Sequence, residues 1–164
     1  HLAVLQGTDV IYVIEERAPK QLPLVTDAGI RLPAHRTASG RAMLAQMTDA
    51  QLRALYPDSE TLRSGRTGGA ALTGLLARVR ECGYAWEENE VTDGFSSIAV
   101  PVLDRSGRAV ASVTLTAANR LSAGSTGPAA LRGIPAFAAD QLAGVSRCAA
   151  EISRRLGAQT PQHA

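Results

Sequence analysis

Three hydroxyl side chains recur at every second residue, at Ser112, Thr114 and Thr116. Successive side chains of a β-strand point to opposite faces, so the three hydroxyls would form a row on one face, with Val113 and Leu115 on the other. A solvated, threonine-rich sheet face is one interpretation. If helices cover that face, the buried hydroxyls need hydrogen-bond partners, and a carboxylate or hydroxyl of a bound ligand could supply them.

A second source of polar groups is the start of a predicted helix at Thr37-Ala38-Ser39-Gly40. The residues that follow, RAMLAQM, are strong helix formers without β-branching, so a helix is expected to begin near Ser39. The first N–H groups of a helix have no intrahelical acceptor and lie at the positive end of its dipole, which suits an anionic ligand. The hydroxyl row and this helix start together predict a binding site.

The residue types give less support for a catalytic site than for a binding site. Every histidine-dependent mechanism would depend on His35, because His1 and His163 lie at the chain ends, and no G-x-S-x-G motif surrounds Ser39. We therefore interpret His35 as ordering the turn into the helix and predict that the protein is not an enzyme. A small enzyme that uses His35, Ser39 and Glu87 in the same cavity is the alternative function.

An acidic group, Glu87, Glu88, Glu90 and Asp93, could hold a metal or act as paired carboxylates. In a strand, Glu88 and Glu90 would share one face while Glu87 points to the other, which splits the group. We interpret most of these side chains as solvated charges and expect no catalytic residue, no metal and no cofactor. The glycine-rich segment 64–69 lacks the Lys-Ser/Thr of a phosphate-binding loop and is expected to be a connection.

Length and composition fit one globular domain: 164 residues, 45% hydrophobic and 20% charged. Seventeen Lys and Arg against fifteen Asp and Glu leave a net charge of +2, too balanced for a domain that mainly grips nucleic acid. No apolar run of about eighteen residues and no leader is seen, so we expect a cytoplasmic protein with no membrane contact. Cys82 and Cys148 are far apart in the sequence and are expected to be reduced thiols in the core.

The hydrophobic pattern predicts strands, then helices, then strands and a final helix. The expected strands cover residues 2–5, 10–14, 22–32 with a turn at 27–29, 84–90, 97–103 and 109–117. The expected helices begin near residue 39, at a capping box formed by Thr48 and Gln51, at Leu72 with a left-handed end at Gly83, and at about residue 135, the last running to residue 156. Connections are expected at 63–69 and 122–133. This order predicts an α+β fold with mostly antiparallel neighbouring strands.

Three segments carry a family resemblance. RLPAHRTASGRAMLA, residues 31–45, resembles the l-P-x-H-x-T-A-x-G-k-A-l-L-A segment of IclR-type transcriptional regulators. GYAWEENE, residues 83–90, followed by GFSSIAVPV, residues 94–102, resembles the family's GYa-x-d-x-E-E-x-x-x-G-x-x-c-I-A-a-P-V block. VTLTA at 113–117 is similar to its l-S-v-S-G, and the opening HLAVL is similar to the first strand after the family's DNA-binding domain.

The resemblance, which covers nearly the whole chain in order, implies an IclR-type effector-binding domain over residues 1–164. Its expected architecture is GAF-like, an antiparallel six-stranded sheet with helices on both faces. The winged helix-turn-helix domain that contacts DNA would precede residue 1 and is absent from these residues. Family membership further implies a homodimer or tetramer that binds a small organic or aromatic carboxylic acid and modulates DNA binding through the absent domain.

The resemblance also assigns a set of site residues. Ala38 and Ser39 fall where backbone N–H groups hold the effector carboxylate, and Thr114 and Thr116 fall on two serines that bond the effector. The remaining implied site residues are Glu87 in the place of an Asp, Ser97 in a place often held by Cys, and Leu24, Leu32 and Phe95 as apolar lining. Glu87 is one methylene longer than the usual Asp and Arg36 adds a charge at the entrance, so the effector is expected to differ from the smallest keto acids.

Overall fold

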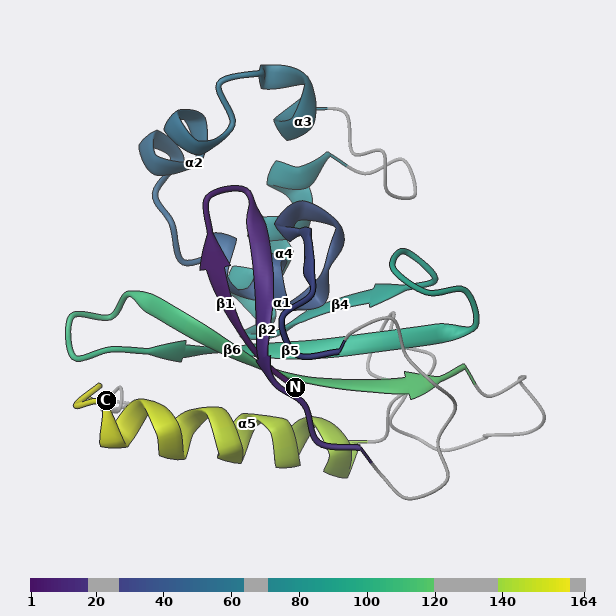
Figure 1. Cartoon of the computed structure of the whole chain (residues 1–164). Helices are drawn as coiled ribbons and strands as arrows, with labels where there is room; N and C mark the ends of the chain where they lie inside the picture. The colour runs from purple at the N-terminus through teal and green to yellow at the C-terminus, as the bar shows by residue number, and fades with distance from the viewer. Residues whose placement is uncertain (18–26, 64–70, 120–138, 160–164) are drawn as a thin grey trace.

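The computed structural model describes residues 1–17, 27–63, 71–119 and 139–159. Within these ranges six strands form one antiparallel sheet in the order β3-β2-β1-β6-β5-β4 (Figure 1). The strands are β1 (Leu2–Gln6), β2 (Asp9–Ile14), β3 (Arg31–Pro33), β4 (Ala85–Glu88), β5 (Phe95–Leu103) and β6 (Ala109–Ala118). The helices are the 3-10 turn η1 (Ala34–Arg36), α1 (Ala38–Leu44), α2 (Asp49–Leu55), α3 (Ser59–Arg63), α4 (Leu72–Cys82) and α5 (Ala139–Arg155).

Helices cover both faces of the sheet. Figure 1 shows α1 and α4 on one face and α5 along the other, and both α1 and α5 contact β5 and β6. Each face therefore has its own core: one gathers the buried side chains of β1, β2, α1 and α4, and the other packs β5 and β6 against α5. The α+β architecture expected from the sequence is confirmed.

The alternation along β6 separates these two cores. Ser112 and Thr114 are 0% and 4% exposed on the face that α1 covers. Val113 and Leu115 pack on the opposite face, against Val145 of α5. Two of the three hydroxyls in the row are therefore buried and Thr116 is half-buried, so the interpretation as a solvated sheet face is wrong.

The hairpin of β1 and β2 stands across the long strands β5 and β6 (Figure 1). Its only pairing with β6 is at Leu2 and Ala3, so the hairpin can curl over the face that carries α1. Val10 and Tyr12 of β2 are buried, and the Tyr12 hydroxyl lies 3.2 Å from Ser39 Oγ of α1. The curl thus brings an N-terminal tyrosine to the start of the first helix.

Local signals set the helix ends where the sequence predicts them. Thr48 and Gln51 form the expected capping box at α2. Gly83 ends α4 at a φ of +80°, which a residue without Cβ adopts at little cost. The short helix α3 was not expected. The predictions for 22–26, 64–69, 122–133 and 135–138 fall outside the described residues.

The two cysteines differ from their prediction in one respect. Cys82 and Cys148 are free thiols, as expected, but both are exposed. Cys82 is the last residue of α4, and Cys148 lies next to the buried Ala149 on α5, so each points off the helix face that packs. The prediction that they are core thiols is wrong.

Candidate functional site

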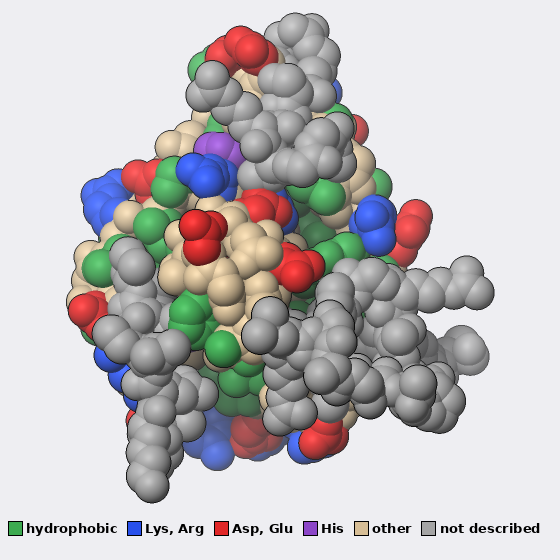
Figure 2. Space-filling view, turned by 90° about the vertical axis from the view of Figure 1, so that its right-hand side faces the viewer, with side chains coloured by type: hydrophobic (Ala, Val, Ile, Leu, Met, Phe, Trp, Pro, Cys, Tyr) green, Lys and Arg blue, Asp and Glu red, His purple; other side chains and the backbone are tan. Residues whose placement is uncertain are grey.

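A pocket opens between the start of α1, the strands β5 and β6, and the turn that joins β4 to β5. Its lining residues are Tyr12, Thr37, Ala38, Glu87, Val91, Thr92, Phe95, Ser97 and Thr116. Its empty space reaches about 300 Å³ only because open solvent at the mouth is counted, and the enclosed part has room for little more than one water molecule. Figure 2 views this face, with acidic side chains around the β4–β5 turn. The lining side chains therefore nearly fill the pocket, and a ligand would have to displace some of them.

The start of α1 presents backbone donors at the pocket wall. Thr37 caps the helix, since its Oγ1 accepts a hydrogen bond from Gly40 N at 3.0 Å and its carbonyl accepts one from Arg41 N at 3.0 Å. The N–H groups of Ala38 and Ser39 have no acceptor among the described residues, as expected for the first turn. Ala38 lines the pocket, so a ligand carboxylate placed there would meet unpaired donors.

Two hydroxyls face the pocket from neighbouring strands. Ser97 of β5 pairs directly with Thr116 of β6, and their side-chain oxygens are 3.0 Å apart. Both residues line the pocket. The two hydroxyls have two hydrogens between them: one makes their mutual bond, and the other can be donated either to the Glu87 carboxyl or to an acidic ligand.

A second group of hydroxyls lies beside the first and is bonded within the protein. Ser39 Oγ is 2.8 Å from Thr114 Oγ1 and 3.2 Å from the Tyr12 hydroxyl. All three residues are at most 4% exposed, and burial raises the pKa of Tyr12 so that it stays protonated. Of the three only Tyr12 lines the pocket. This chain of hydroxyls joins β2, α1 and β6 at the base of the site.

Glu87 brings a buried carboxylate to the pocket. The residue is 3% exposed, and burial raises its pKa, while hydrogen bonds from the Ser97 hydroxyl and the Glu90 N–H lower it in part. Glu90 N lies 3.1 Å from Glu87 Oε2. The pocket thus has backbone donors at one side and a carboxyl acceptor at another, an arrangement that can orient a ligand with two different polar groups.

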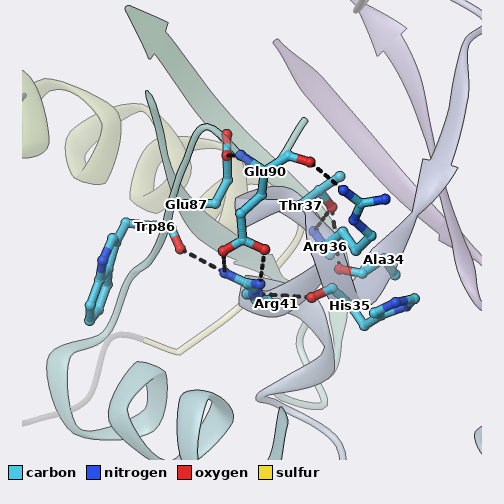
Figure 3. Close-up of polar contacts among 9 residues, drawn as sticks. Ala34, His35, Arg36, Thr37, Arg41, Trp86, Glu87 and Glu90 are labelled. Carbon is cyan, nitrogen blue, oxygen red and sulfur yellow. Dashed lines mark hydrogen bonds and ion pairs between the residues drawn. The ribbon is translucent and has the colours of Figure 1, made fainter. Parts of the chain in front are cut away.

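The β4–β5 turn reverses the expected placement of the acidic side chains. β4 ends at Glu88, and Asn89 has a φ of +57°, so the period-two alternation stops before Glu90. Glu90 turns back to the buried guanidinium of Arg41, with bonds of 2.8 and 2.6 Å to its two carboxylate oxygens (Figure 3). The prediction that Glu88 and Glu90 share one face as solvated charges is wrong for Glu90, whose half-buried carboxylate is ion-paired. Glu87 is buried, while Glu88 and Asp93 are exposed as expected.

A family model described as bacterial transcriptional regulator IclR C-terminal matches residues 1–142. The chain belongs to the IclR family. The HTH-type transcriptional regulator XynR of Escherichia coli K12 is 31% identical over 119 residues, which cover 71% of this chain and 47% of that protein. The chain spans about half the length of the curated relatives it matches. These relatives are transcriptional regulators rather than enzymes.

Solved structures of IclR-family regulators share the fold. The repressor BlcR of Agobacterium tumefaciens aligns with a TM-score of 0.74 at 24% identity, covering 97% of this chain and 60% of that chain. A double mutant of the PobR inducer-binding domain from Acinetobacter, solved in complex with 3-hydroxybenzoic acid, aligns with a TM-score of 0.70 at 23% identity, covering 93% of this chain and 85% of that chain. The curled six-stranded sheet is therefore the fold of the IclR C-terminal domain.

The structure brings most of the residues implied by the IclR resemblance to one place. Those that line the pocket are Ala38, Glu87, Phe95, Ser97 and Thr116. Ser39 and Thr114 lie beside it, bonded to each other. Leu32 of β3 packs against the core cluster instead, and Leu24 lies outside the described residues.

Four lining residues were not predicted for the site: Tyr12, Thr37, Val91 and Thr92. The cap position of Thr37 could have indicated its place beside Ala38, because an N-cap residue always adjoins the first free N–H groups. Tyr12 reaches the pocket through the curl of the hairpin, and Val91 and Thr92 through the turn after Glu90. No periodic pattern in the sequence indicates either arrangement.

The residues of the alternative enzyme are not assembled. His35 does not line the pocket, its ring contacts Tyr56 edge-on at 6.1 Å, and its Nδ1 is buried without a hydrogen-bond partner. Burial and the neighbouring arginines Arg36 and Arg41 lower the pKa of His35. The Ser39 hydroxyl bonds to other hydroxyls rather than to an imidazole. Ser39 and His35 are therefore not paired as nucleophile and base.

The described part of the chain has neither a metal-binding cluster nor a membrane-spanning helix. Across residues 1–17, 27–63, 71–119 and 139–159, no cluster of three or more His, Cys, Asp or Glu side chains is placed to bind a metal ion. None of the helices in those ranges has the length and hydrophobicity needed to cross a lipid bilayer.

Proposed function

We propose that this chain is the ligand-sensing domain of an IclR-type regulator, and that it binds a compact carboxylic acid in the pocket beside α1. Occupancy of the pocket would change how an attached winged helix-turn-helix domain engages DNA in the cytoplasm. The observation that carries the proposal is the meeting of the unpaired Ala38 N–H with the hydroxyls of Ser97 and Thr116 in one small pocket.

The chemistry of the lining supports an acidic ligand with a second polar group. A carboxylate held at the start of α1 would accept from backbone N–H groups and from the Thr116 hydroxyl, with the helix dipole in its favour. The Glu87 carboxyl would repel a second carboxylate but accept a hydrogen bond from a hydroxyl. We therefore favour a hydroxy acid over a dicarboxylic acid.

The relatives support the same class of ligand. The PobR inducer-binding domain was solved with 3-hydroxybenzoic acid, which carries one carboxyl and one hydroxyl group. That compound therefore offers one group to the donors at the start of α1 and another to the Glu87 carboxyl. It serves here as the aromatic probe, with lactate as an aliphatic hydroxy acid and succinate as a dicarboxylic acid.

Thermal unfolding of the chain with each probe tests the proposal. A ligand that binds only the folded state raises the melting temperature, by an amount that grows with its concentration above Kd. We expect 3-hydroxybenzoate or lactate to raise the melting temperature and succinate to leave it unchanged. Native mass spectrometry of the complex should return the probe unaltered. Conversion of the probe would support the enzyme alternative, and no shift with any monocarboxylic acid would contradict the sensor.

Signalling requires that the ligand bind two states of the protein with different affinity. We propose that these states are two arrangements of a homodimer or tetramer, which place the paired DNA-binding domains differently. Sedimentation of the full-length protein with operator DNA, with and without the acid that binds, would measure the coupling. An acid that binds but leaves DNA affinity unchanged would contradict this part of the proposal.

A further inference from the structure

Glu90 has every polar group engaged, although it does not line the pocket. Its N–H donates to Glu87 Oε2 at 3.1 Å, and its carbonyl accepts from Arg36 Nη2 at 2.8 Å. Its two carboxylate oxygens accept hydrogen bonds from the two terminal nitrogens of Arg41, at 2.8 and 2.6 Å. Figure 3 shows the residue held from three sides. Glu87 and Val91, which lie before and after Glu90 in the sequence, line the pocket. The contacts of Glu90 therefore help to fix the positions of these two residues.

Arg41 is the other residue of this ion pair. Its side chain is 3% exposed, and its remaining donors reach the carbonyls of His35 at 2.9 Å and of Trp86 at 3.2 Å. One guanidinium therefore ties together η1, β4 and the β4–β5 turn from its position on α1. A bidentate guanidinium–carboxylate pair fixes orientation as well as distance, which a single point charge does not.

The contacts connect the two walls of the pocket by one ion pair. Ala38 stands on α1, one helical turn from Arg41, and Glu87 stands on β4, joined through its carboxylate to the Glu90 N–H. We propose that Arg41 and Glu90 are positioning residues, whose ion pair fixes the β4–β5 turn, and with it the Glu87 carboxylate, against the start of α1. The inference rests on the proposed function, because it says that the ion pair sets the shape of the effector pocket.

A buried ion pair can also serve stability alone, and the two roles make different predictions. A merely structural pair would, when broken, lower the stability of the whole domain and leave the local geometry of the folded state unchanged. Breaking a positioning pair loosens the β4–β5 turn, while the amides in the rest of the sheet stay protected from hydrogen exchange. The amide proton of residue 90 reports this directly, because it donates to Glu87 and shifts as that carboxylate titrates.

The experiment compares Glu90→Gln with the parent chain by NMR, without any ligand. We expect amide exchange at 89–95 to accelerate by at least about tenfold relative to the β5–β6 amides, as local rather than global opening requires. We also expect the amide proton of residue 90 to lose its response to the titration of Glu87. Arg41→Lys, which keeps the charge without the fork, should give an intermediate acceleration. Glu151→Gln, which breaks two exposed ion pairs on α5, is the matched control and should change neither signal.

Two results would overturn the proposal. One is equal acceleration of exchange in the turn and in the β5–β6 pair, which marks a stabilising role only. The other is a folded Glu90→Gln chain whose residue 90 amide still follows Glu87. Because neither signal needs an effector, the test is independent of acid binding: absence of binding would contradict the proposed function, while these signals decide the role of the pair.

Discussion

Ser39 Oγ lies 2.8 Å from Thr114 Oγ1, although 75 residues separate them in the chain. With the Tyr12 hydroxyl 3.2 Å from Ser39, these groups satisfy one another at the base of the pocket. Thr116, two residues further along the same face of β6, instead reaches Ser97 and lines the pocket. The two threonines of one strand therefore have different surroundings: Thr114 is bonded within the protein, and Thr116 lines the pocket.

Thr116→Val should weaken binding of the acid that stabilises the chain, by about fivefold, because one hydroxyl hydrogen bond contributes about 1 kcal/mol. The fold should be retained, since valine has the same shape and the position is only partly buried. Titration calorimetry with the acid identified by thermal unfolding measures the effect. Unchanged affinity would remove Thr116 from the proposed site.

Thr114→Val should show the reverse. The variant leaves the fully buried Ser39 hydroxyl with Tyr12 as its remaining partner, so we expect the free energy of unfolding to fall by about 1–2 kcal/mol. Acid affinity should change by less than about threefold, as for a group without ligand contact. Urea denaturation and calorimetry on the same preparation separate the two effects. A stable variant with much weaker binding would place Thr114 at the ligand instead.

Much of this arrangement could be predicted from the sequence where the signal is local. The alternation along β6 predicts which side chains share a face, and the Thr37 cap and the Thr48 capping box act within one helical turn. Such signals depend on neighbours a few residues apart. They therefore indicate the hydroxyl row and the helix start, the two parts of the site that the sequence predicts.

The rest depends on tertiary contacts that no local pattern contains. The positive φ of Asn89 turns Glu90 away from the strand direction, and the turn is held in part by residues distant in the sequence, Arg41 on Glu90 and Asn119 on Asn89. Tyr12 reaches Ser39 because the hairpin curls over the sheet. Cys148 looks like a core residue by type, yet the face of α5 that packs contains Ala149 instead.

Glu87→Gln should change the pH dependence of stability. Burial raises the pKa of Glu87 above its ordinary 4.5, so the folded state holds the proton more tightly than the unfolded state does. The stabilisation from this group is then fully present below pH 4.5 and is lost as pH rises through the raised pKa. The variant cannot ionise at this position. The difference in free energy of unfolding, variant minus parent, should therefore rise over this pH interval and then stay constant.

Urea denaturation at intervals between about pH 4 and 8 measures this difference, and the interval spans the ordinary pKa and the region above it. Glu151→Gln provides the control, because its exposed carboxyl on α5 has its pKa lowered by Arg154 and Arg155, so its removal changes stability with pH in the opposite direction. A difference between Glu87→Gln and the parent that is constant with pH would show that Glu87 titrates alike in the folded and unfolded chain.

The exposed thiols should react in the folded state. Cys82 and Cys148 are both free and exposed, so a thiol reagent such as dithionitrobenzoate needs no unfolding to reach them. We expect the same two thiols per chain to be titrated in native buffer as in denaturant. Cys148→Ser should halve the native signal. Thiols that react only in denaturant would contradict the exposure of these side chains.

Gly40→Ala should unfold or strongly destabilise the domain, because α1 passes too close to η1 for any side chain. A Cβ at Gly40 would lie 2.1 Å from the carbonyl oxygen of Ala34 and 2.4 Å from its Cα, and backbone atoms cannot move aside as a flexible side chain can. We expect a loss of at least about 3 kcal/mol in the free energy of unfolding. Gly74→Ala is the matched control, since nothing lies within 4 Å of its Cβ and alanine favours the helix α4 by about 0.5–1 kcal/mol. Equal melting temperatures for the two variants would mean that α1 does not approach Ala34 so closely, and the helix start would then lose the position from which it faces the pocket.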